Sequence, residues 1–139
     1  MSAGKTLTCD VAIVGSGPTG MTIAHLLGQA GVKVILIERN ATTVTQPRAV
    51  SIDDEALRTM QAIKLDREVI ENVALDYGSN YFTPAGLCFA KVEPTTREYG
   101  FPRRNAFTQP KLEATLREHL VRYPQVMQLF EHECESVTE

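Results

Sequence analysis

The stretch Val11-Ala-Ile-Val-Gly15-Ser-Gly17-Pro-Thr-Gly20 decides the fold, because a short β-branched strand runs straight into a glycine-rich turn. An uncharged run of this kind is typical of a buried parallel strand, which we expect over residues 6–14. The glycines follow the pattern Gly-x-Gly-x-x-Gly. In that pattern the first glycine permits a tight turn, the second lets a pyrophosphate approach bare backbone, and the third lets a helix pack close to the sheet.

A helix should begin immediately after this turn. Pro18 suits its first turn, where the missing N–H would be unpaired in any case, and the remaining N–H groups would point at phosphates. We predict that Gly31 ends the helix. Its inner face is predicted to consist of four apolar residues, Ile23, Leu26, Leu27 and Ala30.

A second strand is predicted over residues 33–37, and it places Glu38 about eighteen residues beyond Gly20. A carboxylate there can accept hydrogen bonds from both hydroxyls of an adenosine ribose and would repel a 2′-phosphate. A nucleoside-triphosphate loop is excluded because Met21 stands where that motif needs a lysine. The sequence therefore predicts a βαβ unit that binds a dinucleotide.

Composition narrows the class of protein further. The 139 residues are 43% hydrophobic and 22% charged, which suffices for one ordinary core, and the net charge of −3 gives no footprint for nucleic acid. No apolar run reaches membrane-spanning length and the N-terminus lacks a signal-peptide core, so we expect a cytoplasmic location and no membrane partner. Cys9, Cys88 and Cys134 are few and widely spaced, which predicts small buried side chains and neither disulfides nor a metal site.

The middle of the chain is predicted to contain two helices and a hairpin. The first helix should cover residues 52–63, with Ser51 as its cap, Asp54 as the reciprocal partner, and acidic residues in its first turn rather than a metal site. Its buried stripe is expected to be Ile52, Ala56, Leu57, Met60 and Ile63. A shorter helix should cover residues 66–73, and a β-hairpin should turn at residues 83–86.

Residues 93–107 are predicted to be irregular and carry Arg97, Arg103, Arg104 and Asn105, which favour a solvated face over a ligand cleft. A helix should open at Thr108-Gln109-Pro110 and close before Tyr123, and its buried face should consist of Leu112, Leu116 and Leu120. The next parallel strand is expected over residues 126–130, and the segment up to Glu139 is interpreted as one more strand.

About eighty-five residues thus separate the second and third parallel strands, where a plain nicotinamide-binding domain has a helix of roughly a dozen residues and short loops. We expect an α/β chain with a Rossmann-like FAD/NAD(P)-binding fold. Its parallel sheet contains the βαβ unit, and helices and a β-hairpin are inserted before the third strand. The fold is incomplete within these residues.

Four stretches resemble the FAD-dependent aromatic hydroxylases, the single-component flavoprotein monooxygenases, and most strongly the 3-(3-hydroxyphenyl)propionate hydroxylase type. They are Gly15–Gly20, Glu38-Arg39, Pro47–Met60 and Pro102–Pro110. The resemblance implies an oxidoreductase of aromatic compound catabolism that uses NADH or NADPH to reduce FAD and transfers one oxygen atom of O₂ to a small phenolic acid. It fixes no oligomeric state, and a homo-oligomer is compatible with it.

The same resemblance assigns the cofactor site. The turn formed by Gly15, Ser16, Gly17, Pro18, Thr19 and Gly20 would surround the FAD pyrophosphate, and Glu38 would hold the adenosine ribose. Arg39 would lie against the adenine, Arg48 would contact the flavin side, Gln109 would reach the ribityl or pyrophosphate region, and Cys134 would approach the adenine through its backbone. From its type and loop position alone, Arg48 could equally be a solvated charge. No catalytic residue is expected, and His25, His119 and His132 are interpreted as structural.

Enzymes of this family are several times longer, and their later Asp-Gly and Gly-Asp motifs and substrate-binding sheet have no counterpart here. We therefore interpret residues 1–139 as the N-terminal portion of an FAD-binding domain that is inactive alone. Two alternatives are an NAD-binding domain of a dehydrogenase and a non-catalytic dinucleotide-binding module. The long insertion and Gln109-Pro110 disfavour the first, and the hydroxylase-like stretches disfavour the second.

Overall fold

The computed structural model describes residues 6–42 and 46–138, which fall into two compact regions. We call the first the βαβ region; it combines Met1–Thr43 with Leu116–Glu139. We call the second the inserted region, Val44–Thr115. The boundary between them lies inside helix α4 (Gln109–His119).

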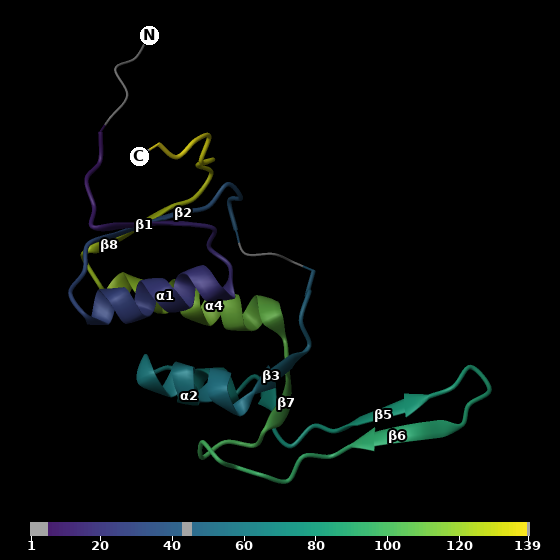
Figure 1. Ribbon diagram of the computed structural model, residues 1–139. Helices are drawn as coiled ribbons and strands as arrows, with labels where there is room; N and C mark the ends of the chain where they lie inside the picture. The colour runs from purple at the N-terminus through teal and green to yellow at the C-terminus, as the bar shows by residue number, and fades with distance from the viewer. Residues whose placement is uncertain (1–5, 43–45, 139) are drawn as a thin grey trace. The chain divides into compact units, whose positions relative to one another are not determined.

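A three-stranded parallel sheet organises the βαβ region (Figure 1). Its order is β1 (Val11–Val14), β2 (Val34–Ile37) and β8 (Val126–Leu129), and Val34 is paired with Val11 on one side and with Val126 on the other. Central β2 is the most apolar strand and is buried along most of its length, as a strand covered on both faces must be. The α/β class and all three predicted parallel strands are confirmed.

The first strand is shorter than predicted. The carboxylate of Asp10 accepts a hydrogen bond from the Lys33 N–H at 2.9 Å, and the Asp10 N–H donates to the Lys33 carbonyl at 2.9 Å. These contacts fix the entrance to the sheet, and regular pairing begins only at Val11. Residues 6–10 lie outside the strand, so the prediction of a strand over residues 6–14 was wrong for its first half.

Helix α1 (Pro18–Gln29) buries a different face from the predicted one. Ile23 and Leu26 are each 42% exposed and Ala30 is exposed, whereas the buried residues are Met21, Ala24, His25 and Gly28. The small residues select this face, because a methyl group at Gly28 would come within 2.8 Å of the Tyr123 ring. Gly31 ends the helix with φ of +79°, as predicted.

His25 links α1 to the helical segment that precedes β8. Its Nε2 lies 2.8 Å from the Leu116 carbonyl, which can only accept, so Nε2 carries the proton and Nδ1 faces the Arg122 guanidinium. Burial lowers the pKa of His25; the bond to Leu116 opposes this shift, while the charges of Arg122 and His119 add to it. Leu116 and Leu120 are fully buried as predicted, Leu120 in the short 3₁₀ helix η1 (Leu120–Arg122). The structural interpretation of His25 is confirmed.

The inserted region contains helices, a small antiparallel sheet and a hairpin. Its elements are β3 (Ser51–Asp53), α2 (Asp54–Ala62), α3 (Asp66–Ile70), β4 (Val73–Ala74), β5 (Ser79–Phe82), β6 (Cys88–Val92) and β7 (Arg104–Phe107). The sheet has the order β3-β7-β4, and β5 pairs with β6 as the predicted hairpin (Figure 1). The core holds four of the five residues predicted for the buried stripe, Ile52, Leu57, Met60 and Ile63, together with Leu65 and Val69. The fifth, Ala56, is only half-buried, so its prediction as a core residue was wrong.

Long-range pairing changes the predicted helix ends. Ser51 belongs to β3 and is paired with Ala106, so the cap of α2 is Asp53, whose carboxylate accepts the Ala56 N–H at 2.8 Å. Likewise α3 ends at Ile70 rather than at Val73, because Val73 is paired with Phe107. The predictions of Ser51 as the cap and of a helix over residues 66–73 were wrong at these positions.

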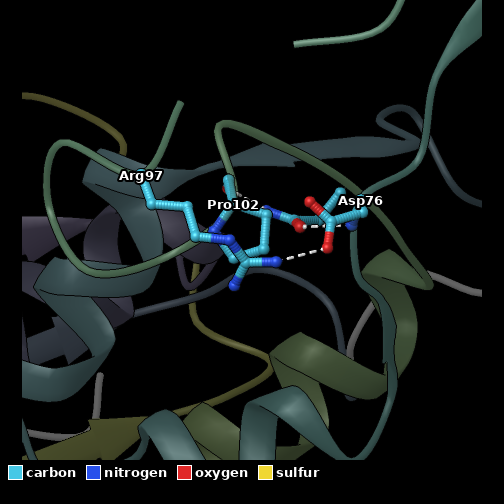
Figure 2. A network of polar contacts seen from close by, with 4 residues as sticks. Asp76, Arg97 and Pro102 are labelled. Carbon is cyan, nitrogen blue, oxygen red and sulfur yellow. Dashed lines mark hydrogen bonds and ion pairs between the residues drawn. The ribbon is translucent and has the colours of Figure 1, made fainter. Parts of the chain in front are cut away.

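Residues 93–107 are not irregular throughout, since the last four form β7. Asn105 is fully buried; its amide donates to the carbonyls of Ile52 and Pro102, and its oxygen accepts the Asp76 N–H. Figure 2 shows that Asp76 also forms an ion pair with Arg97, in which Oδ2 of Asp76 lies 2.6 Å from Nη2 of Arg97. The solvated interpretation therefore holds for Arg97, whose side chain is 54% exposed, and was wrong for Asn105.

The segment after β8 turns away from the sheet. Glu131 has φ of +58°, the His132 N–H donates to the Glu38 carbonyl at 3.0 Å, and no strand occurs over residues 130–138. The prediction of one more strand was wrong.

The prediction that the three cysteines are buried was also wrong, since Cys88 is exposed and Cys9 and Cys134 are half-buried. Among residues 6–42 and 46–138, no helix is both long and apolar enough to cross a membrane.

Candidate cofactor-binding site

The glycine-rich turn uses its three glycines for different reasons. Gly15 has φ of +101° and donates its N–H to the Ile37 carbonyl at 2.8 Å, so its backbone conformation requires glycine. A side-chain carbon at Gly20 would collide with the Gly15 carbonyl oxygen. No atom lies within 4 Å of a side-chain carbon built at Gly15 or Gly17, so among these three glycines a collision excludes a side chain only at Gly20. The open space beside Gly17 is what close approach of a ligand to the backbone needs.

Helix α1 presents its positive end beside this space. Gly17 is the cap of the helix, and Pro18 occupies its first turn as predicted. The helical bonding starts with the Met21 N–H donating to the Gly17 carbonyl at 3.0 Å. The amides earlier in an α-helix have no intrahelical partner. The first turn also carries no acidic side chain. This end of α1 is therefore suited to an anionic group.

Glu38 joins the end of β2 to the turn. One carboxylate oxygen accepts the Ser16 N–H at 2.9 Å, and the other accepts the Asn40 N–H at 2.9 Å and the Asn40 side chain at 2.6 Å. Partial burial acts to raise the pKa of Glu38, but these bonds and the charge of Arg39 outweigh it, so the pKa is lowered and the group is ionised at neutral pH.

Three protein donors occupy three of the roughly four lone-pair positions of that carboxylate. It can accept one further hydrogen bond as it stands. Acceptance from both hydroxyls of a ribose, as expected from the sequence, requires one of the bonds to Ser16 or Asn40 to be exchanged. The assignment of Glu38 to a ribose stays a prediction with this geometric condition attached.

A cavity of about 300 Å³ opens at the carboxyl ends of β2 and β8. It brings together four of the predicted residues, Gly15, Glu38, Arg39 and Cys134. Val14, Ile37, His132 and Glu133 complete its lining. The volume lies at the lower end of the range for small-molecule pockets.

Sequence reasoning missed His132 and Glu133 as lining residues. A signal was available, because neighbouring parallel strands end at the same edge of a sheet and ligands bind there. Residues that directly follow β8 should therefore lie beside those that follow β2, as they do here.

Ser16 adds a polar group that the described residues leave unsatisfied. Its side chain is 5% exposed, and its hydroxyl oxygen is buried with no hydrogen-bond partner among residues 6–42 and 46–138. Buried hydroxyls nearly always have a partner. The unpaired hydroxyl, the open face of Gly17 and the Glu38 carboxylate fit a phosphate-linked nucleoside better than a purely structural turn.

The inserted region holds Arg48 and Gln109. The Gln109 side-chain oxygen accepts the N–H groups of Arg48 at 2.8 Å and Ala49 at 2.9 Å, across 61 positions of sequence for Arg48. Its side-chain nitrogen donates to Glu113 at 2.8 Å. Gln109 therefore uses three of its four bonding positions within the protein, and one N–H is left for a ligand.

Arg48 itself is exposed. The hydrogen bond from its backbone N–H to Gln109 defines where its side chain begins. Within the described parts of the chain, no group of three or more His, Cys, Asp or Glu side chains is arranged to hold a metal ion. The roles of Arg48 and Gln109 toward a cofactor stay predictions.

Curated relatives cover nearly all of the chain. It is 46% identical over 126 residues to 3-(3-hydroxy-phenyl)propionate/3-hydroxycinnamic acid hydroxylase from Klebsiella pneumoniae subsp. pneumoniae, a match to 91% of this chain and 23% of that protein. It is 44% identical over 130 residues to the protein of the same name from Shigella sonnei, covering 94% of this chain and 24% of the relative. The chain thus spans about a quarter of the length of these relatives.

Solved structures share the fold. The crystal structure of p-nitrophenol 4-monooxygenase from Pseudomonas putida DLL-E4 matches with a TM-score of 0.83 and 24% identity, over 92% of this chain and 33% of that one. The family model for the FAD binding domain matches residues 8–139. A parallel sheet, a glycine turn that is open at Gly17 and an acidic residue hydrogen-bonded to that turn accompany the match, and the chain belongs to the FAD binding domain family.

Proposed function

We propose that this chain is the N-terminal portion of the FAD-binding domain of an enzyme that hydroxylates a phenolic aromatic acid with NADH or NADPH and O₂. Support comes from relatives at 44–46% identity that are named as hydroxylases of 3-(3-hydroxy-phenyl)propionate. Because the chain spans about a quarter of those relatives, the substrate, the reaction and the cytoplasmic location belong to the proposal. So does the expectation of no nucleic-acid or membrane partner.

One observation carries the cofactor assignment: Glu38 hydrogen-bonds the Ser16 amide directly beside the open backbone of Gly17. That arrangement offers an acceptor for a ribose hydroxyl next to donors for a pyrophosphate. A nicotinamide-dependent dehydrogenase could share it. The insertion of two helices and a hairpin between β2 and β8 disfavours that alternative, as does the family match.

When bound, FAD supplies the redox and oxygen chemistry, and the protein supplies binding and orientation. In this chain the residues proposed to bind it are those of the glycine turn and five residues beyond it. They are Gly15, Ser16, Gly17, Pro18, Thr19 and Gly20 at the pyrophosphate, Glu38 and Arg39 at the adenosine, Arg48 and Gln109 nearer the flavin, and Cys134 through its backbone. None of them is proposed to transfer a proton to substrate.

The test compares three ligands on the 139-residue chain. FAD and ADP share the adenosine and pyrophosphate groups, so both are expected to bind and to compete, whereas NADP⁺ carries a 2′-phosphate that Glu38 repels. Flavin fluorescence followed during titration measures the FAD affinity, and displacement measures the others. Tight binding of NADP⁺ with no binding of FAD would reject the assignment.

The companion test concerns turnover. The chain alone is expected neither to retain FAD at one per chain nor to oxidise NADH or NADPH in air, with or without 3-(3-hydroxyphenyl)propionate. A full-length enzyme that carries this sequence is expected to do both and to release a hydroxylated product. A stable yellow sample of the 139-residue chain that consumes nucleotide would refute the proposal that residues 1–139 are only a portion of the domain.

A further inference from the structure

Gln109 and Glu113 form a buried polar pair at the start of α4. They are 7% and 2% exposed, lie one helical turn apart, and are joined by the 2.8 Å bond from the Gln109 side-chain nitrogen to a Glu113 carboxylate oxygen. The other end of the Gln109 amide accepts both the Arg48 and the Ala49 N–H. All four residues belong to the inserted region.

The chemistry of this pair fixes a direction. A side-chain amide can fit its site in two orientations related by exchange of oxygen and nitrogen. Backbone N–H groups can only donate and an ionised carboxylate can only accept. Because the Arg48 and Ala49 N–H groups can only donate, the oxygen of Gln109 must face them, and its nitrogen then donates to Glu113, which supports the same orientation from the other side.

We propose that Glu113 is a positioning residue: it orients the Gln109 amide, which holds the Arg48-Ala49 backbone and so places the Arg48 side chain for the cofactor. This inference rests on the proposed function for its last step, the contact of Arg48 with FAD. The Gln109 orientation also leaves one side-chain N–H for an acceptor on the cofactor.

Two single substitutions and their combination test the orientation. Glu113→Gln replaces the carboxylate with an amide that can also donate, so Gln109 is held less firmly, although the two backbone N–H groups still favour its direction. Gln109→Glu keeps an acceptor for the two N–H groups but places a second carboxylate against Glu113. In the double variant Q109E/E113Q the carboxylate at position 109 accepts both backbone N–H groups and also the amide at position 113, so the holding contact is restored.

Hydrogen exchange of the Arg48 and Ala49 amides, resolved by NMR in the 139-residue chain, reports the contact directly. Exchange is expected to speed up by roughly threefold to tenfold in Glu113→Gln, the effect of losing one net hydrogen bond. A larger increase is expected in Gln109→Glu, and near-normal rates in the double variant. Glu118→Gln and Gln61→Glu, at exposed positions, are the matched controls and should leave both amides unchanged.

The outcomes separate the steps. Unchanged amide exchange in Glu113→Gln, or single effects that simply add in the double variant, would overturn the proposal. If either single variant fails to fold, recovery of folding and amide protection in the double variant still supports it, and no recovery contradicts it. FAD titration adds the last link: faster exchange with unchanged FAD affinity in Glu113→Gln would reject the role toward the cofactor. In the double variant, restored amide protection with FAD affinity still reduced would assign the remaining Gln109 N–H to the cofactor.

Discussion

The βαβ region and the inserted region present their candidate cofactor residues by different means. In the βαβ region the backbone does most of the work: Gly15 adopts a left-handed conformation, Gly20 lets α1 approach the turn, and the end of the helix provides donors. In the inserted region a pair of buried side chains, Gln109 and Glu113, holds a loop that is 61 positions away. A site built from the backbone can be recognised in the sequence by its glycines. A site built from a pair of side chains far from the loop that they hold cannot be recognised in this way.

The largest expected effect breaks the turn of the βαβ region. Gly20→Ala places a methyl group against the Gly15 carbonyl and should lower the free energy of unfolding by about 2–3 kcal/mol or more. Gly17→Ala meets open space and should change stability by less than about 1 kcal/mol while weakening binding of FAD and ADP. Urea denaturation and nucleotide titration of both variants measure the contrast. Equal losses of stability would contradict the distinction between the two glycines.

Removing the charge of Glu38 should weaken FAD and ADP binding by roughly 1–3 kcal/mol, the range for a charged hydrogen bond. Glu38→Gln keeps the size of the side chain, and Glu98→Gln, an exposed carboxylate in the inserted region, is the control for net charge. Fluorescence titration of FAD gives the affinities. Wild-type affinity in Glu38→Gln would remove Glu38 from the site.

Arg48→Ala tests the inserted region with a smaller expected effect. The side chain is exposed, so stability should change by less than about 0.5 kcal/mol and FAD affinity should fall by about 0.2–1 kcal/mol. In a full-length enzyme, flavin reduction by NADH or NADPH should slow. Arg103→Ala removes another exposed arginine of the same region and should do neither. Parental affinity and reduction rates in Arg48→Ala would leave Arg48 as a surface charge.

Acidification should lower the stability of the βαβ region in two steps. Because burial lowers the pKa of His25, the unfolded chain binds that proton more tightly, so its stabilising contribution is complete above pH 6.5 and is lost as the pH falls below it. The contribution of Glu38 to stability changes with pH in the same direction. Because the pKa of Glu38 is lowered in the folded chain, this contribution is complete above about pH 4.5 and is lost as the pH falls below it.

Amide exchange measured in both regions between pH 7 and pH 4 checks this order. His132→Gln, which changes an exposed histidine, should leave the first step in place, and His25→Gln should remove it. A pH-independent stability between 7 and 5 in the unmodified chain would contradict the part assigned to His25.

Sequence reasoning succeeded where a local rule determines the structure. Gly31 takes the positive φ expected of a glycine that ends a helix, the hairpin turns at residues 83–86 as predicted, and the three parallel strands follow from short apolar runs. It failed where a partner far along the chain decides. Ser51 could cap a helix, but pairing with Ala106 makes it a strand residue. Asn105 looked solvated among arginines, yet it satisfies backbone groups from residues 52, 76 and 102.

The inner face of α1 was misjudged for a related reason. Apolar residues were assigned to the interior by size, but close packing against Tyr123 and Val126 selects the face that carries Gly28. The pairing of Gln109 with the backbone of Arg48 and Ala49 could not be predicted either, because nothing in a sequence marks which distant N–H groups lack a partner. The cavity residues after β8 could have been found from strand order alone.

The neighbouring strands β2 and β8 impose an order on folding. Val34 is hydrogen-bonded in register with Val126, about ninety residues later, so the sheet cannot be completed until the whole intervening segment has been made. At ribosomal rates this leaves one edge of β2 unpaired for on the order of ten seconds. During that interval the apolar strand is open to pairing with other chains.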